Sequence, residues 1–224
     1  MKKALLIIII CLLLAGCGAS RPVPDWLSIS YSQLESYKKN YLGGKEKIAA
    51  AQFKSILGEI RKSGDLEILA RAHLIRMALQ TSVLENMEDS EYLKINALSP
   101  SPQNSNFYAF LKGEVGQVDE NLLPSQYTGF YRSLRLDAGC AACLQEVEKI
   151  EDPLSRLIAA GILVHFRPHD ERVLKKAIET ASAEGWKKAL LVYLERLQAY
   201  FESRKETQKA RDMGGRIKLI RDQP

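Results

Sequence analysis

Cys140 and Cys143 form the pair of residues whose type and spacing point most directly to chemistry. Residues three apart share one face of a helix, so the two thiols can bridge if the first helical turn is distorted. A redox CxxC usually follows a strand in a βαβ unit, and no such strand is indicated here. Leu144 stands where haem attachment needs histidine, and zinc would need a second ligand pair. We predict a local disulfide or two buried thiols, with no metal and no cofactor.

The other titratable residues form no catalytic pattern. His165 and His169 are separated by a proline, so they cannot share a helix face as a zinc-binding pair would. His73 interrupts an apolar face and is predicted to pack there. Carboxylates such as Glu146 and Glu148 stand beside lysine, which is typical of a solvated helix surface. Nucleophile-elbow and phosphate-cradling glycine motifs are absent from the sequence. We therefore predict no catalytic residue and a protein that is not an enzyme.

The N-terminus carries an export signal. After Met1-Lys2-Lys3, an uncharged apolar run extends over residues 4–14. A membrane-spanning helix needs about 20 apolar residues, so this run matches a secretory signal instead. It ends in Leu14-Ala15-Gly16-Cys17, which resembles the lipobox of bacterial lipoproteins. The resemblance implies removal of residues 1–16 and a diacylglyceryl group on Cys17. The alternative is an ordinary cleaved signal that leaves Cys17 as a spare thiol.

The same resemblance implies a location. Two or three acyl chains anchor a protein durably, at about 0.8 kcal/mol per buried methylene. Gly18 follows Cys17, and the lack of aspartate there is similar to the pattern sorted to the outer membrane. Residues 17–26 are predicted to be the lipidated cysteine and a proline-containing tether. We expect the protein in the cell envelope, on the periplasmic face of the outer membrane if the host is diderm.

Composition limits the number of domains and the class of partner that we expect. Removing 16 of the 224 residues leaves 208, which suits one domain or two small ones. The formal net charge of +5 falls to +3 once Lys2 and Lys3 are lost with the signal. That excess is too small to indicate a nucleic-acid partner.

Apolar residues recur with helical spacing along nearly every long segment, and no run alternates as a strand would. We therefore predict an all-α fold. The apolar face predicted from Lys45 to Ile60 consists of Ile48, Ala49, Phe53, Ile56, Leu57 and Ile60. Gly64 and the capping residue Asp65 then start a second helix, so the two helices should form an antiparallel hairpin.

The mature chain divides into four predicted regions. Helical hairpins occupy residues 27–98, and a loop rich in proline and small polar residues (SPSPQNSN) occupies residues 99–106. A helical region follows over residues 107–213, with helix starts at Asp152 and Asp170 and a turn at Gly185. Gly214-Gly215 is predicted to separate a basic tail over residues 214–224.

Part of this pattern resembles the tetratricopeptide repeat (TPR). Ala49 and Phe53 are similar to the small residue and the ring of its second helix, and Leu69-Ala70 with His73 to those of its first helix. A small residue lets two helices approach, and the ring fills the groove beside it. The strict period of about 34 residues is missing. The resemblance implies antiparallel hairpins in a TPR-like α-solenoid, with an irregular helical bundle as the alternative.

Aromatic residues gather at Tyr31, Tyr37 and Tyr41, and again at Phe107 and Tyr108. Core packing is one explanation, and a partner surface is the other. Stacked hairpins typically present a concave surface that holds a partner's peptide or helix.

The sequence thus predicts a membrane-anchored, non-catalytic scaffold or adaptor with a protein partner in the envelope. By resemblance, TPR-like lipoproteins often serve envelope assembly, secretion or pilus machines. Two alternatives stay open: a periplasmic thiol-redox protein using Cys140 and Cys143, and a cell-wall-associated binder or enzyme.

Overall fold

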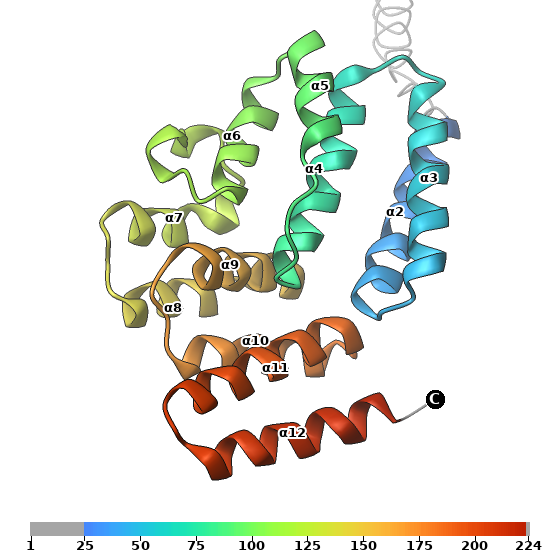
Figure 1. The fold of residues 1–224 in the computed structure, drawn as a ribbon. Helices are drawn as coiled ribbons and strands as arrows, with labels where there is room; N and C mark the ends of the chain where they lie inside the picture. The colour runs from blue at the N-terminus through green and yellow to red at the C-terminus, as the bar shows by residue number, and fades with distance from the viewer. Residues whose placement is uncertain (1–24, 223–224) are drawn as a thin grey trace, which may run out of the picture.

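The computed structural model describes the backbone of residues 25–222 and the side chains from Ser32 onward. The signal, the lipobox with Cys17 and most of the expected tether lie outside the described residues, as does the side chain of Tyr31. Within the described part the chain is helical and contains no strand, so the predicted all-α fold is confirmed (Figure 1). The elements in chain order are α2 (Asp25–Leu42), α3 (Glu46–Arg61), α4 (Leu66–Ser82), α5 (Ser90–Leu98), α6 (Pro102–Leu111), the 3₁₀ helices η1 (Val115–Gln117), η2 (Glu120–Leu122) and η3 (Ser125–Tyr127), α7 (Thr128–Arg135), α8 (Cys140–Glu148), α9 (Pro153–Phe166), α10 (Glu171–Ala183), α11 (Lys187–Ser203) and α12 (Thr207–Arg221).

Aspartate side chains start three of these helices where the sequence predicted a start. Asp65 accepts a hydrogen bond from the backbone N–H of Ile68 at 3.0 Å, and Asp152 accepts one from that of Ser155 at 2.7 Å. Asp170 caps α10 in the same way. Each carboxylate satisfies a backbone donor that the first helical turn leaves unpaired.

The loop predicted over residues 99–106 is wrong from Pro102 onward, where α6 begins. Ser101 caps this helix, and proline suits the first helical position because its missing N–H is not needed there. Two of the polar residues that suggested a loop, Asn104 and Asn106, are buried and hydrogen-bonded. Asn104 donates its side-chain amide to the carbonyl of Glu67 at 3.2 Å, and Asn106 donates to that of Asp119 at 2.9 Å.

Two further expectations are wrong. The helix α12 runs without interruption through Gly214-Gly215, so this pair does not separate a tail. Burial of Ala210 and Ile217 outweighs the poor helix propensity of glycine, which costs about 1 kcal/mol per residue. Ile48, predicted on the apolar face of α3, is 51% exposed. A helix turns by about 100° per residue, which places Ile48 outside the face that the buried residues of α3 form.

Neighbouring helices pack as antiparallel pairs at both ends of the chain, α2 with α3 and α10, α11 and α12 in turn (Figure 1). In the centre, α9 packs against α4, and α11 also contacts α2. Gly161 of α9 permits the central contact, since a Cβ there would lie 2.9 Å from the carbonyl carbon of Thr81. In a regular solenoid each repeat contacts only its neighbours. These distant contacts depart from that arrangement, and the TPR-like repeat stays a prediction.

Candidate functional site

A groove of about 510 Å³ lies between the α2–α3 hairpin and α4. One wall is α3, and the other consists of α4 and the segment that leads from it into α5. Tyr37 and Tyr41 of α2 also line the groove, as does Lys188 at the start of α11. The groove exists because α3 packs closely against α2 along its length but contacts α4 much less (Figure 1).

Lys188 joins the two walls at one end of the groove. Its ammonium forms an ion pair with Glu85 at 2.6 Å and another with Glu46 of α3 at 3.2 Å. The same ammonium lies 4.4 Å from the centre of the Tyr41 ring, and the Tyr41 hydroxyl donates to the Glu85 carboxylate. The side chain of Lys188 is only 13% exposed, so these contacts form in a partly desolvated place where charges attract more strongly.

Aromatic rings fill the centre of the groove wall. The Tyr37 ring stacks on Phe53 at 5.2 Å between centroids, and the edge of His73 meets Phe53 at 5.6 Å. His73 is 4% exposed, as the packing prediction required, and its Nε2 has no hydrogen-bond partner among the described residues. Burial, and next the positive charge of Arg76, lower the pKa of His73, so the neutral ring is favoured.

Some charged side chains of the groove form ion pairs, and others do not. Arg76 forms an ion pair with Glu88 and lies 5.5 Å from the centre of the Phe53 ring. Glu91 pairs with Lys94 at 2.6 Å, outside the groove. Lys54 and Arg61 of α3 also line it, and both are exposed. Neither has a carboxylate within ion-pair distance among the described side chains.

The predicted aromatic partner residues do not form one site. Tyr37 and Tyr41 line the groove, but Phe107 and Tyr108 belong to α6. Tyr108 stacks on Tyr92 at 4.9 Å and donates its hydroxyl to Asp89 at 2.9 Å. Burial and this carboxylate raise the pKa of Tyr108 to about 12.

Phe107 lines a separate hollow of about 430 Å³ with residues of α4 and the segment 121–124. The structure thus adds Lys54, Arg61 and Lys188 to the tyrosines of α2 as groove residues. Sequence reasoning missed these three, because a single basic residue on a helix has no distinctive pattern.

Another hollow, of about 700 Å³, is more polar. It is lined by η1, η2 and α7 and includes Arg135 and Arg167. Two of its charged groups already have partners: the guanidinium of Arg167 donates to the carbonyl of Leu134 at 3.3 Å, and Glu120 pairs with Arg132. Few aromatic side chains face this hollow, so it lacks the anchoring surface that the groove offers.

Both cysteines lie at the start of α8 and line a hollow of about 390 Å³ that also includes His169. Both are free thiols; Cys143 is buried and donates to the carbonyl of Ala138 at 3.2 Å. Burial raises the pKa of Cys140, although the amide of Asp170 opposes that shift. A raised pKa disfavours the nucleophilic thiolate. The two thiols are unbridged in this structure, and a disulfide in the exported protein stays a prediction.

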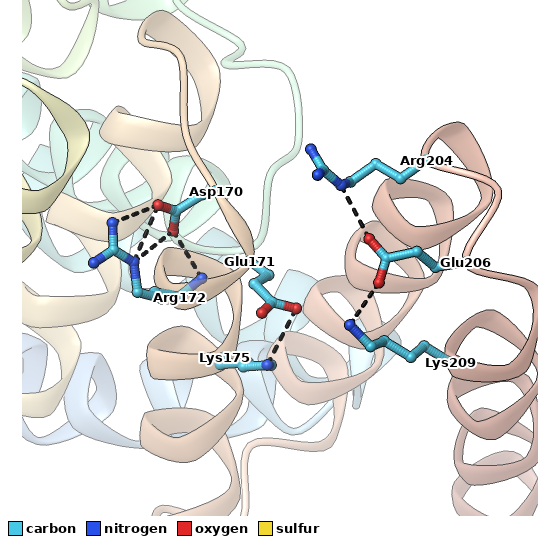
Figure 2. Close-up of polar contacts among 7 residues, drawn as sticks. All are labelled: Asp170, Glu171, Arg172, Lys175, Arg204, Glu206 and Lys209. Atoms are coloured by element: carbon cyan, nitrogen blue, oxygen red, sulfur yellow. Dashed lines mark hydrogen bonds and ion pairs between the residues drawn. The ribbon is translucent and has the colours of Figure 1, made fainter.

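Three carboxylates near the C-terminus, those of Asp170, Glu171 and Glu206, are ion-paired on the surface and do not form an acid–base pair. Figure 2 shows Asp170 held by Arg172, Glu171 by Lys175, and Glu206 between Arg204 and Lys209. Hydrogen bonds from Lys209 and Arg204 lower the pKa of Glu206, and one from Arg172 lowers that of Asp170. Such shifts keep the groups ionised, whereas a general acid needs a raised pKa.

The described side chains, from Ser32 to Asp222, include no cluster of three or more histidine, cysteine or carboxylate groups suited to hold a metal ion. Within the same range, no helix combines the length and the apolar composition that a membrane span requires. No protein-family model matches the chain, and neither a curated protein nor a solved structure is significantly similar to it.

Proposed function

We propose that this protein is a lipid-anchored, non-catalytic scaffold of the cell envelope that holds a segment of a partner protein in the groove between α3 and α4. The observation that carries the proposal is the groove itself, open between two helical walls and lined by tyrosine, phenylalanine and charged side chains. Aromatic residues and arginine are the types that concentrate at protein interfaces. A rigid helical surface also suits capture of a peptide or helix.

The anchor in this proposal is the lipid on Cys17. Its support is the resemblance of Leu14-Ala15-Gly16-Cys17 to a lipobox, behind a basic and apolar signal. With Gly18 after the cysteine, we place the protein on the periplasmic face of the outer membrane in a diderm host. The segment 17–24 would then hold the helical domain close to the membrane, where its partner would be recruited.

The two alternatives have less support. A thiol-redox function would need a reactive thiolate, but burial raises the pKa of Cys140 and Cys143 is buried. A wall-associated enzyme would need a cleft with paired carboxylates of separated pKa. The carboxylates that line the groove are instead engaged with Lys188, Arg76 and Lys94.

Crosslinking in living cells tests the proposal. A photoreactive amino acid placed at Ala50, which is exposed and lines the groove, should capture an envelope protein. The same amino acid at Lys218, on the exposed surface of α12, is the control and should capture much less. With Cys17→Ala, the chain should leave the membrane fraction and the Ala50 adduct should be lost. Equal capture from both positions, or none from either, would contradict the scaffold function.

A further inference from the structure

We propose that the corner between α5 and α6 rests in the headgroup layer of the bilayer that holds the lipid anchor. The corner comprises residues 97–100, of which Ala97, Leu98 and Pro100 are exposed. This inference rests on the proposed lipid on Cys17 and adds the face of the helical domain that meets the membrane.

The start of α2 lies at the same end of the domain as this corner (Figure 1). The helices α2 and α3 are antiparallel and in contact, so Asp25 lies near Arg61, the last residue of α3. A short turn leads from there to α4. The corner lies beside the start of α4, because Asn104 of α6 donates its side-chain amide to the carbonyl of Glu67 at 3.2 Å. The segment 17–24 therefore enters the domain at the end that carries the corner.

The segment 17–24 is short compared with the domain. Asp25 is eight residues after Cys17, and a chain extends at most about 3.6 Å per residue, or about 29 Å here. The helix α3 has 16 residues and spans about 24 Å. Its far end, at Glu46, contacts Lys188 of α11 at 3.2 Å. The helix α12 packs on the outside of α11, about 8–10 Å further (Figure 1).

These lengths limit how the domain can face the bilayer. The end with the corner can meet the bilayer without stretching the segment 17–24. With α12 facing the bilayer, the start of α2 would stand more than the length of that segment above the membrane. The lipid anchor therefore favours contact through the end that carries the corner.

The corner exposes an apolar tip at this end. Leu98 is 76% exposed, and the exposed Ala97 and Pro100 lie beside it. Leu136 and Leu219 are exposed to a similar degree, but they follow α7 and belong to α12, away from the start of α2 (Figure 1). An apolar side chain held at the membrane surface gains by entering the boundary between headgroups and acyl chains. The place of Leu98, rather than its exposure alone, points to the bilayer.

The charges around the corner balance. Three ion pairs lie there, Lys62 with Glu59, Arg71 with Glu67, and Lys94 with Glu91. Arg61 and Asp65, at the turn between α3 and α4, have opposite signs. The described side chains thus add no net repulsion from anionic headgroups, and the contact depends on apolar area. Salt screens charges only, so high salt should not weaken it.

Quenching by brominated lipid tests the contact in the full lipidated chain. The chain is purified from membranes and placed in vesicles of phosphatidylethanolamine and phosphatidylglycerol with brominated acyl chains. A fluorescent amino acid replaces Gln103, which is exposed in the first turn of α6 and leaves the corner intact. We expect at least about threefold stronger quenching there than from Lys218 on α12, because only groups within about 5–10 Å of the acyl boundary meet the bromine.

A charge at the tip separates contact from mere proximity. With the fluorescent amino acid at Gln103, Leu98→Glu should lower the quenching by about half or more, because a carboxylate opposes entry below the headgroups. Leu219→Glu is the matched control, an exposed leucine changed in the same way on α12, and should leave the quenching unchanged. Both side chains are exposed, so neither change should disturb the fold.

The outcomes separate this inference from the lipid anchor. Strong quenching at Gln103 that is lost in Leu98→Glu and kept in Leu219→Glu supports the corner. Equal quenching at Gln103 and Lys218, or quenching insensitive to Leu98→Glu, overturns the corner and leaves the anchor standing if the chain floats with the vesicles. A chain that does not float with the vesicles, as expected only for Cys17→Ala, overturns both. A fluorescence change without bromine quenching would assign the corner to a second copy of the chain and overturn the bilayer contact.

Discussion

At the scale of single residues, the end of α11 holds a backbone strain that can be relieved. Lys205 has φ of 61°, a left-handed conformation that a Cβ disfavours, and its side chain is exposed. We expect Lys205→Gly to raise the free energy of unfolding by about 0.5–1 kcal/mol in urea denaturation. Lys205→Ala keeps the Cβ and should have a much smaller effect. Equal changes in the two variants would show that the strain is not the cause.

His73 makes stability depend on pH in a predictable direction. Burial lowers its folded-state pKa below the value of about 6.5 expected in the unfolded chain. The contribution of the neutral ring to the free energy of unfolding is therefore complete above pH 6.5. It is lost as the pH falls below that value, because the unfolded state then binds the proton more readily. The positive charges of Arg76 and Arg61 also lower the pKa of His73, and the negative charge of Glu91 raises it.

His73→Phe should remove this dependence while keeping a ring against Phe53. The histidine Nε2 has no hydrogen-bond partner among the described residues, so the substitution breaks none there. We expect the loss of unfolding free energy between pH 7.5 and 5.5 to be smaller in the variant than in the wild type. Urea denaturation at both pH values measures the difference. The same loss in both proteins would mean that His73 does not titrate differently on folding.

At the scale of elements, the α4–α9 contact depends on the absence of one side chain. In Gly161→Ala, the new Cβ would lie 2.9 Å from the carbonyl carbon of Thr81, and neither backbone can move freely. We expect a loss of about 1–3 kcal/mol in unfolding free energy, typical of overpacking. Gly215→Ala in α12 meets no atom within 4 Å and should gain up to about 1 kcal/mol from helix propensity. Thermal and urea denaturation should show a lower free energy of unfolding for Gly161→Ala and a higher one for Gly215→Ala.

Local sequence signals predicted the helices but not their arrangement. Asp65, Asp152 and Asp170 marked helix starts correctly, because capping depends on residues within one turn. The loop before Phe107 and the break at Gly214-Gly215 were wrong, because buried hydrogen bonds and packing overrode local composition. The groove was partly predicted through Tyr37 and Tyr41. Its position depends on how the α2–α3 hairpin meets α4, which no local pattern encodes.

At the scale of the whole molecule, the N-terminal hairpin is held to the rest of the chain through a few contacts. Lys188 stands 142 residues from Glu46, and its ion pairs with Glu46 and Glu85 connect α3 and the segment after α4 to the start of α11. The Tyr41 ring packs against the same ammonium. The position of the α2–α3 hairpin, and with it the width of the groove, should therefore depend on this one side chain.

Lys188→Met keeps the length of the side chain and removes its charge, which leaves the partly buried Glu85 without a cation. We expect a loss of about 1–3 kcal/mol, the usual cost of an unmatched charged hydrogen bond. Hydrogen exchange followed by mass spectrometry should show faster exchange in α2 and α3 and little change in α9. Lys47→Met, an exposed change on α3, should leave both regions as in the wild type. Uniform acceleration across all helices would instead mean that the hairpin and the remaining helices open as one unit.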